Sequence, residues 1–253
     1  MQQARRMSAP RAIALCQCFN GALEFQAGNW VEAERALHES IQLYREIGAA
    51  SGEALACQRL GVLLTAQKRL DEALAVIQEG VMVAEHALMR AHCLTRLYAA
   101  MARNRLQAGD ALAARQALML GLDMSGRHGH CTTCDALLLP VAISVNIAQR
   151  ALETAESFCQ RLDAAAAEYT SHTWVALARQ GRGELAAAQG DVTGALSCYQ
   201  SAYERFKAAN YDYEAARCLT AVAQLHQHLH HPQDAKAAQK EAEQIFTQLG
   251  AST

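Results

Sequence analysis

The sequence predicts an all-α protein, an α-solenoid of about six antiparallel helix pairs. The chain has 253 residues, of which 51% are hydrophobic and 6% aromatic, and only three are proline. Ala and Leu dominate, and both are strong helix formers. A repeat of about forty residues and apolar side chains at helical spacing complete the argument for this fold class.

The repeat is marked by one small residue in each unit. The intervals between successive markers are 40, 40, 42, 40 and 40 residues, and the markers are Ala33, Ala73, Ala113, Ala155, Ala195 and Ala235. Twelve residues before each marker, four of six positions hold Gly or Ala, and the six are Gly21, Gly61, Met101, Ile143, Gly183 and Ala223. Small residues in both helices of a pair would let their backbones approach closely.

Each unit is predicted to be two helices joined by a turn. In the second unit, apolar residues recur at helical spacing before the turn at 68–69 and again after it. Gly-Asn or Gly-Asp occupies the turns at 28–29, 109–110 and 190–191, where Gly relaxes the backbone and Asn or Asp can cap the next helix. The repeats are expected near residues 11–48, 51–88, 91–127, 134–168, 171–209 and 212–249. One helix pair cannot bury its apolar face alone, so residues 1–253 are predicted to form a single domain.

This pattern resembles the tetratricopeptide repeat (TPR) family. The match consists of the small residue in the first helix, the turn, the marker Ala, and a small residue seven positions later in four units: Ser40, Gly80, Ala202 and Ala242. The resemblance implies a right-handed superhelix. The period of about forty, longer than the usual 34 residues, is similar to that of the sensor regions of bacterial transcriptional regulators of the MalT and LuxR type. That likeness implies a sensor module, although the phosphate loop and recognition helix of such regulators do not occur in this sequence.

Charge and hydropathy narrow the function classes. The formal net charge is −2 without a clustered basic face, so direct nucleic-acid binding is not expected. The longest apolar run, 136–145, is about half the length that a membrane span needs. The absence of an apolar segment after the N-terminal arginines predicts no secretory signal, and most of the nine cysteines lie in apolar helical contexts. These features favour a cytoplasmic protein.

The concave face is the expected binding surface for a protein, a peptide or a small effector, since repeat proteins commonly use it so. Its predicted residues come from the first helices of the pairs and are Gln58, Tyr98, Arg105, Gln180 and Arg217. Carboxylates of a partner would bind near the arginines. Several of these side chains could instead be packed or simply solvated.

The segment "GRHGHCTTC" (126–134) is the candidate metal site. Cys131 and Cys134 have the Cys-x-x-Cys spacing of tetrahedral zinc sites, and His128 or His130 would add a third ligand. The two-residue delay of the fourth unit places this cluster in a loop between the third and fourth helix pairs. In a stack of antiparallel pairs, this loop lies beside the starts of the first helices of neighbouring units. The fourth ligand of a zinc site is therefore expected from His92, Cys93 or His172.

A thiol-redox role is the alternative for Cys131 and Cys134. A Cys-x-x-Cys pair at a helix N-terminus has its thiolate favoured by the helix dipole. In this interpretation, metal ligation or disulfide formation at the two cysteines would set the shape of the solenoid and thereby its groove.

Two weaker signals complete the analysis. His226 and His230 are four residues apart, so one helix face could present both to a metal. No set of residues suggests catalysis, and the chain is not expected to be an enzyme.

Overall fold

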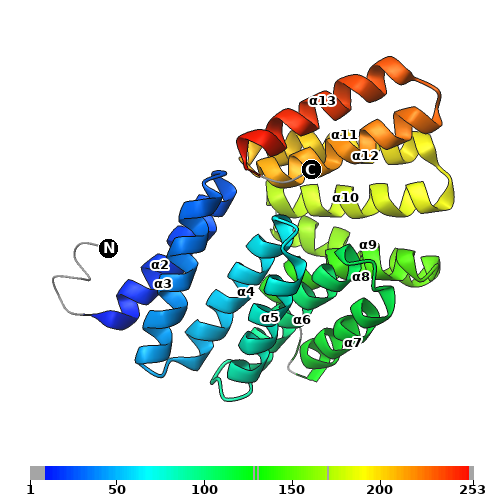
Figure 1. The fold of residues 1–253 in the computed structure, drawn as a ribbon. Helices are drawn as coiled ribbons and strands as arrows, with labels where there is room; N and C mark the ends of the chain where they lie inside the picture. The colour runs from blue at the N-terminus through cyan, green and yellow to red at the C-terminus, as the bar shows by residue number, and fades with distance from the viewer. Residues whose placement is uncertain (1–8, 128, 130, 170, 251–253) are drawn as a thin grey trace. The chain divides into compact units, whose positions relative to one another are not determined.

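The computed structural model describes residues 9–250 except 128, 130 and 170, and these residues form twelve α-helices and no strand (Figure 1). The predicted all-α fold class of paired helices is confirmed. In chain order the helices are α2 (Pro10–Gln26), α3 (Trp30–Glu46), α4 (Ala50–Ala66), α5 (Leu70–Ala84), α6 (Arg90–Gln107), α7 (Ala111–Arg127), α8 (Thr132–Ala148), α9 (Leu152–Tyr169), α10 (His172–Gln189), α11 (Val192–Ala208), α12 (Asp212–His228) and α13 (Pro232–Gln248).

A left-handed residue ends the first helix of every pair. The six residues have φ between 58° and 85° and recur every 40 or 41 positions, at Gly28, Lys68, Gly109, Arg150, Gly190 and His230. The amide of the following residue donates to the carbonyl five positions back, as from Asn29 to Glu24 at 2.8 Å and from Asp191 to Ala186 at 2.9 Å. This is the six-to-one bond of a Schellman motif, which satisfies a carbonyl that the helix end would otherwise leave unpaired.

The buried residues correct the repeat register in the third unit. Ala114 is fully buried, as Ala33, Ala73, Ala155 and Ala195 are, whereas Ala113 is partly exposed. Ala114 therefore marks this unit, and the predicted marker Ala113 is wrong. The positions twelve before and seven after it become Ala102 and Gly121, which are small residues like their counterparts in other units.

The corrected register also changes the interpretation of the 42-residue interval. The intervals on either side of Ala114 are 41 residues each. One extra residue lies in α6, which has 18 residues where α4 has 17. The connection between α7 and α8 therefore carries one extra residue and not the two that were predicted.

Small residues in the helices allow close helix packing. A Cβ added to Gly61 in α4 would lie 2.3 Å from Cγ1 of Ile77 in α5. Ser40 in α3 is fully buried and donates from its hydroxyl to the carbonyl of Ala14 in α2 at 2.9 Å. These contacts are the physical basis of the sequence repeat.

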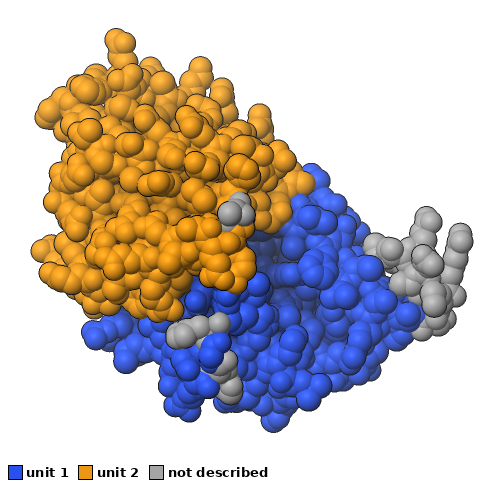
Figure 2. Space-filling model, turned by 180° about the vertical axis from the view of Figure 1, so that it is seen from behind, with its two compact units in different colours: residues 1–25, 29–138 blue, residues 26–28, 139–253 orange. Residues whose placement is uncertain are grey.

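The chain divides into two compact units, shown in two colours in Figure 2. Unit 1 comprises residues 1–25 and 29–138, and unit 2 comprises residues 26–28 and 139–253. The boundary at 138–139 falls within α8, just before Pro140, whose missing amide interrupts the helix ladder. A single domain over residues 1–253 stays a prediction. Among the described helices, none is long and apolar enough to cross a membrane.

Candidate metal centre and partner surface

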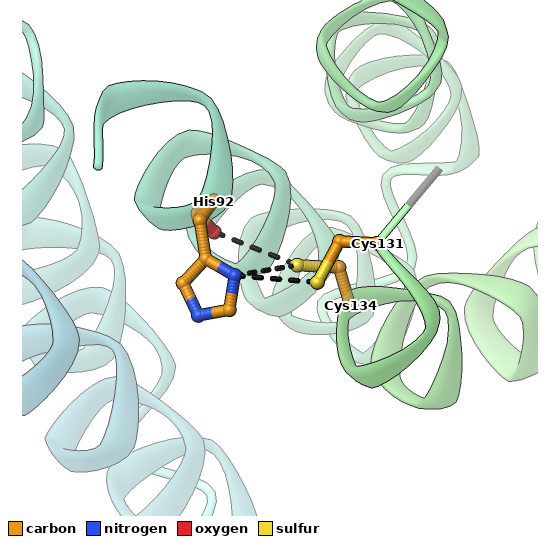
Figure 3. A group of neighbouring side chains, drawn as sticks. All are labelled: His92, Cys131 and Cys134. Atoms are coloured by element: carbon orange, nitrogen blue, oxygen red, sulfur yellow. Dashed lines mark hydrogen bonds between the residues drawn. The ribbon is translucent and has the colours of Figure 1, made fainter. Parts of the chain in front are cut away.

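Three side chains of unit 1 converge on one point: His92, Cys131 and Cys134 (Figure 3). His92 lies in the first turn of α6, Cys131 directly precedes α8, and Cys134 lies in the first turn of α8. The turn is set by the backbone, because the amides of Cys134 and Asp135 donate to the carbonyl of Cys131 at 2.8 and 3.0 Å. These bonds start the helix and leave both thiols on the side that faces α6.

The distances fit a tetrahedral metal site. Nδ1 of His92 lies 3.4 Å from Sγ of Cys131 and 3.2 Å from Sγ of Cys134. All three donor atoms lie within 4.8 Å of one another. A zinc ion with bonds of about 2.3 Å to sulfur and about 2.0 Å to nitrogen places such atoms about 3.6 Å apart. Nδ1 of His92 carries either one proton or one free lone pair, so it can form one hydrogen bond. Two thiols lie beside it, and one hydrogen bond cannot serve both.

The surroundings keep His92 in the form that binds metals. Burial lowers the pKa of its imidazole, and the nearby charge of Arg96 lowers it further. A lowered pKa means a neutral ring at pH 7, which can donate a lone pair to a cation.

The two thiols differ in their surroundings. Burial raises the pKa of Cys131, but hydrogen bonds with Thr133 and Cys134 outweigh it, so the pKa lies below its ordinary value. Burial raises the pKa of Cys134 to about 12, its hydrogen bond with Cys131 adds to the rise, and Arg96 opposes it. Cys134 is 1% exposed, whereas Cys131 is partly exposed. Metal binding at this site would therefore release a proton from Cys134 in particular.

A cavity of about 310 Å³ adjoins the three donors. Its lining is mixed, with apolar thioethers beside a guanidinium and hydroxyls, and consists of Leu88, Met89, Arg90, Ala91, His92, Thr95, Met124, Ser125, Cys131 and Cys134. A metal held by His92 and the two cysteines would therefore be accessible to a small molecule. The sequence carried no signal for this cavity, because its walls come from three separate segments.

The other predicted ligands have different positions. Cys93 is fully buried, and its thiol lies 3.7 Å from the carbonyl of Ser51, so it faces the core. His172 begins α10 in unit 2 and is not among the three converging residues. His128 and His130 lie outside the described residues. Two residues that sequence reasoning missed support the site: Thr133, whose hydroxyl lies 3.2 Å from Sγ of Cys131, and Arg96, which donates to the carbonyl of Thr133 at 3.3 Å.

The five predicted groove residues differ in exposure. Gln58 and Gln180 are buried, with 5% and 6% exposure, so they offer little surface to a partner. Tyr98, Arg105 and Arg217 are partly exposed. The groove as a binding surface stays a prediction.

The two arginines of this set have different neighbours. Arg105 donates from Nε and Nη2 to the side-chain oxygen of Asn104, at 3.1 and 2.8 Å, which is a neutral acceptor. Arg217 instead pairs with the carboxylate of Glu214 at 2.6 Å. The contact with Asn104 does not offset the positive charge of Arg105, whereas the carboxylate of Glu214 offsets that of Arg217.

Comparison with solved structures finds helical repeat proteins. A Rap protein complexed with Competence and Sporulation Factor matches with a TM-score of 0.77 and 14% identity over 95% of this chain. Aspartyl phosphate phosphatase F from Bacillus subtilis matches with a TM-score of 0.62 and 13% identity, over 100% of this chain and 76% of its own. BtubC from P. vanneervenii matches with a TM-score of 0.55 and 14% identity, over 95% of this chain and 93% of its own.

These likenesses establish a shared fold of TPR-like helical repeats. The chain spans 65% of the length of the Rap protein that it matches. Neither a protein-family model nor a curated protein sequence matches the chain.

Proposed function

We propose that this chain is a TPR-like module that binds a protein or peptide, and that a zinc ion held by His92, Cys131 and Cys134 regulates it. The observation that carries the metal part is the convergence of three donor atoms from two separate segments within 4.8 Å. Two thiolates and one neutral imidazole suit zinc, and three protein ligands leave a fourth position for water, a further histidine or a small ligand.

The binding part of the proposal is supported by the fold and by its neighbours. Solenoids of helix pairs present extended surfaces that bind other chains. The Rap protein that shares this fold is complexed with Competence and Sporulation Factor. Tyr98 and Arg105 belong to α6, the helix that also carries His92. A ligand or metal at the start of α6 therefore acts on the same element as the proposed partner contacts, as in the sensor part of a regulator.

Metal analysis of the purified chain tests the zinc site. We expect the zinc content of protein purified without added metal to fall by about one ion per chain after Cys131→Ser or Cys134→Ser, because each substitution removes a thiolate ligand. Cys198→Ser is the matched control, since Cys198 is also partly exposed but lies in α11 of unit 2. Wild-type protein with no zinc and two titratable thiols at this loop would contradict the site.

Affinity for the natural partner tests the binding surface. We expect Tyr98→Ala and Arg105→Ala to weaken binding at least about tenfold each, while circular dichroism stays that of the wild type. Arg115→Ala is the control, because Arg115 is an exposed arginine of α7 outside the predicted surface. Unchanged affinity of both variants in a pull-down would remove this surface from the proposal.

A reversible disulfide between Cys131 and Cys134 is the second candidate. The two sulfurs already lie within 4.8 Å, and Cys131 is partly exposed at the start of α8. In this reaction glutathione disulfide accepts two electrons and two protons from the thiols, and a sulfur–sulfur bond of about 2.05 Å forms.

Mass spectrometry separates the two candidates. Metal-free protein incubated with glutathione disulfide would lose two hydrogens at this peptide if the redox function holds, and zinc-loaded protein would be protected. A chain that binds no zinc but forms this disulfide would favour the redox function.

A further inference from the structure

The turn between α12 and α13 brings together a second set of metal donors, in unit 2. Atoms of His226, His231 and Asp234 lie within 4.8 Å of one another. His226 lies in the last turn of α12, His231 is the N-cap of α13, and Asp234 lies in its first turn. All three come from nine consecutive residues, so the turn itself determines the arrangement.

The backbone explains why His231 and not His230 faces His226. The helix ends at His228, and His230 takes a left-handed conformation with φ of 58°, which reverses the chain. The amide of His231 then donates to the carbonyl of His226 at 2.9 Å. The two imidazoles lie 5.9 Å apart between ring centroids, at an angle of 37°. The spacing of four residues that pairs His226 with His230 on a helix face therefore does not apply.

A second observation points to a ligand at this turn. Nδ1 of His226 is buried and has no hydrogen-bond partner among the described residues. A buried polar atom without a partner costs free energy, so such atoms are normally satisfied by protein, water or an ion. His231 and Asp234 are exposed. A cation bound here would thus have one ligand with a buried nitrogen, His226, and two ligands exposed to solvent, His231 and Asp234.

We infer that His226, His231 and Asp234 form a site for a divalent transition-metal ion. Two imidazole nitrogens and one carboxylate oxygen suit zinc, cobalt, nickel and ferrous iron, whereas magnesium and calcium prefer oxygen ligands alone. The remaining coordination positions face solvent. The site contains no thiolate, so thiol oxidants that act on Cys131 and Cys134 leave it intact, and it does not depend on the function proposed for unit 1.

Zinc titration of a chain without the first site tests this inference. In a Cys131→Ser, Cys134→Ser background, isothermal titration calorimetry should show one bound zinc per chain. His231→Ala and Asp234→Asn should each weaken that binding at least about tenfold, since each removes one of three protein ligands. Both residues are exposed, so the variants are expected to fold as the background does.

His228→Ala in the same background is the matched control. His228 is an exposed histidine in the same segment, but it is not one of the three converging residues. It should bind zinc as the background does, and magnesium should bind none of the chains measurably. The inference is overturned if the background binds no zinc, or if His231→Ala binds as tightly as His228→Ala.

Cobalt gives a second readout that separates the two sites. Cobalt at a site with thiolates has an intense sulfur-to-metal charge-transfer absorption, whereas nitrogen and oxygen ligands give only weak bands. The background chain should therefore show the weak bands alone, and His231→Ala should remove them. A charge-transfer band that persists in the background would contradict the assignment.

Discussion

Gly80 lies where α5 meets two neighbouring helices. A Cβ at this position would lie 2.7 Å from Cδ2 of Leu97 in α6 and 2.8 Å from Cβ of Cys57 in α4. The leucine methyl can rotate away, but the cysteine Cβ moves only with its backbone. We therefore expect Gly80→Ala to lower the free energy of unfolding by about 1–3 kcal/mol, as overpacking does. Urea denaturation followed by circular dichroism measures it.

Gly126→Ala is the control for this substitution. Gly126 is an exposed residue of α7, and apart from its chain neighbours and the backbone of its own helix no atom of the described residues lies within 4 Å of its added Cβ. The same change should here be neutral or stabilise by about 0.4–1 kcal/mol, through the unfolded chain. Equal destabilisation of both variants would contradict the packing explanation for Gly80.

The sequence predicted the two cysteines of the candidate centre but not which of the possible further ligands lies beside them. His92 and Cys93 are adjacent, so spacing alone cannot choose between them. Helix phase decides, because Cys93 continues the apolar face of Leu94 and Leu97, which are buried, and His92 points about 100° away from it. The cavity beside the centre could not be predicted, since its walls depend on how three segments pack.

The turns that end the first helices share a left-handed residue, but the type of that residue differs from turn to turn. Gly109 and Lys68 are both left-handed, with φ of 79° and 64°, and Gly109 has open space around it. A side chain in this conformation costs about 1 kcal/mol. Gly109→Ala should therefore destabilise by about 1 kcal/mol, and Lys68→Gly should stabilise by about 0.5 kcal/mol after the added entropy of the unfolded chain.

Thermal unfolding of the two variants measures this difference. The signs are expected to be opposite, because one variant introduces strain and the other relieves it. A loss of stability in both would show that Lys68 makes a contact worth more than its backbone strain.

Arg182 joins α10 to α9 through two carboxylates. Its guanidinium contacts Glu156 at 2.7 Å and Asp163 at 2.7 Å, with the arginine side chain 26% exposed. Arg182→Met keeps the apolar stem but removes these ion pairs. We expect a loss of about 1 kcal/mol at pH 7, which is modest because the carboxylates are solvated.

The stabilising effect of Arg182 should disappear in acid. Hydrogen bonds from Arg182 lower the pKa of Glu156 below its ordinary 4.5. A lowered pKa in the folded state stabilises it above pH 4.5, and this contribution is lost as the pH falls through the folded pKa. Wild type and Arg182→Met should therefore differ in urea midpoint at pH 7 and converge near about pH 3.

Arg35→Met is the control for this comparison. Among the described residues, Arg35 pairs along its own helix, with Glu32 and Glu39, and its side chain is 62% exposed. The same loss of charge should there change stability by less than about 0.5 kcal/mol. A larger effect than at Arg182 would contradict the inter-helix role.

Repeat elements were predictable from the sequence because the small residues that pack between helices recur at a fixed period. The error in the third unit has a physical cause. Two single-residue additions, one in α6 and one after α7, together give an interval of 42 residues, which looks like one insertion. Ala102 and Gly121 mark the corrected register. Ala102 is fully buried, and a Cβ added to Gly121 would lie 3.0 Å from Cδ1 of Leu138 in α8.

For the whole molecule, zinc bound at His92, Cys131 and Cys134 should stabilise one part of the chain selectively. All three proposed donors lie in unit 1, and they connect α6 to the start of α8. Chelation of zinc from the wild type should therefore increase amide hydrogen exchange in α6 and at the start of α8, and leave α10 unchanged. In Cys131→Ser protein the chelator should leave hydrogen exchange in α6 and α8 unchanged. A uniform change in the exchange of all helices would contradict the view that this zinc ion stabilises only the helices it connects.

The fold class of the whole chain followed from composition and period, whereas the division into two units did not. The small residues that mark the repeat are alike in unit 1 and unit 2, so the repeat pattern does not indicate where one unit ends and the other begins. Pro140 is the one local signal near residues 138–139, and a proline within a helix is not specific enough to divide a chain.

The two segments of the proposed centre leave the ribosome at different times. His92 is synthesised 39 residues before Cys131, so α6 and α7 emerge before either thiol does. In the proposed centre, ion capture therefore cannot precede the emergence of Cys134. If the proposed centre binds zinc, the supply of metal at that stage would determine the fraction of loaded protein.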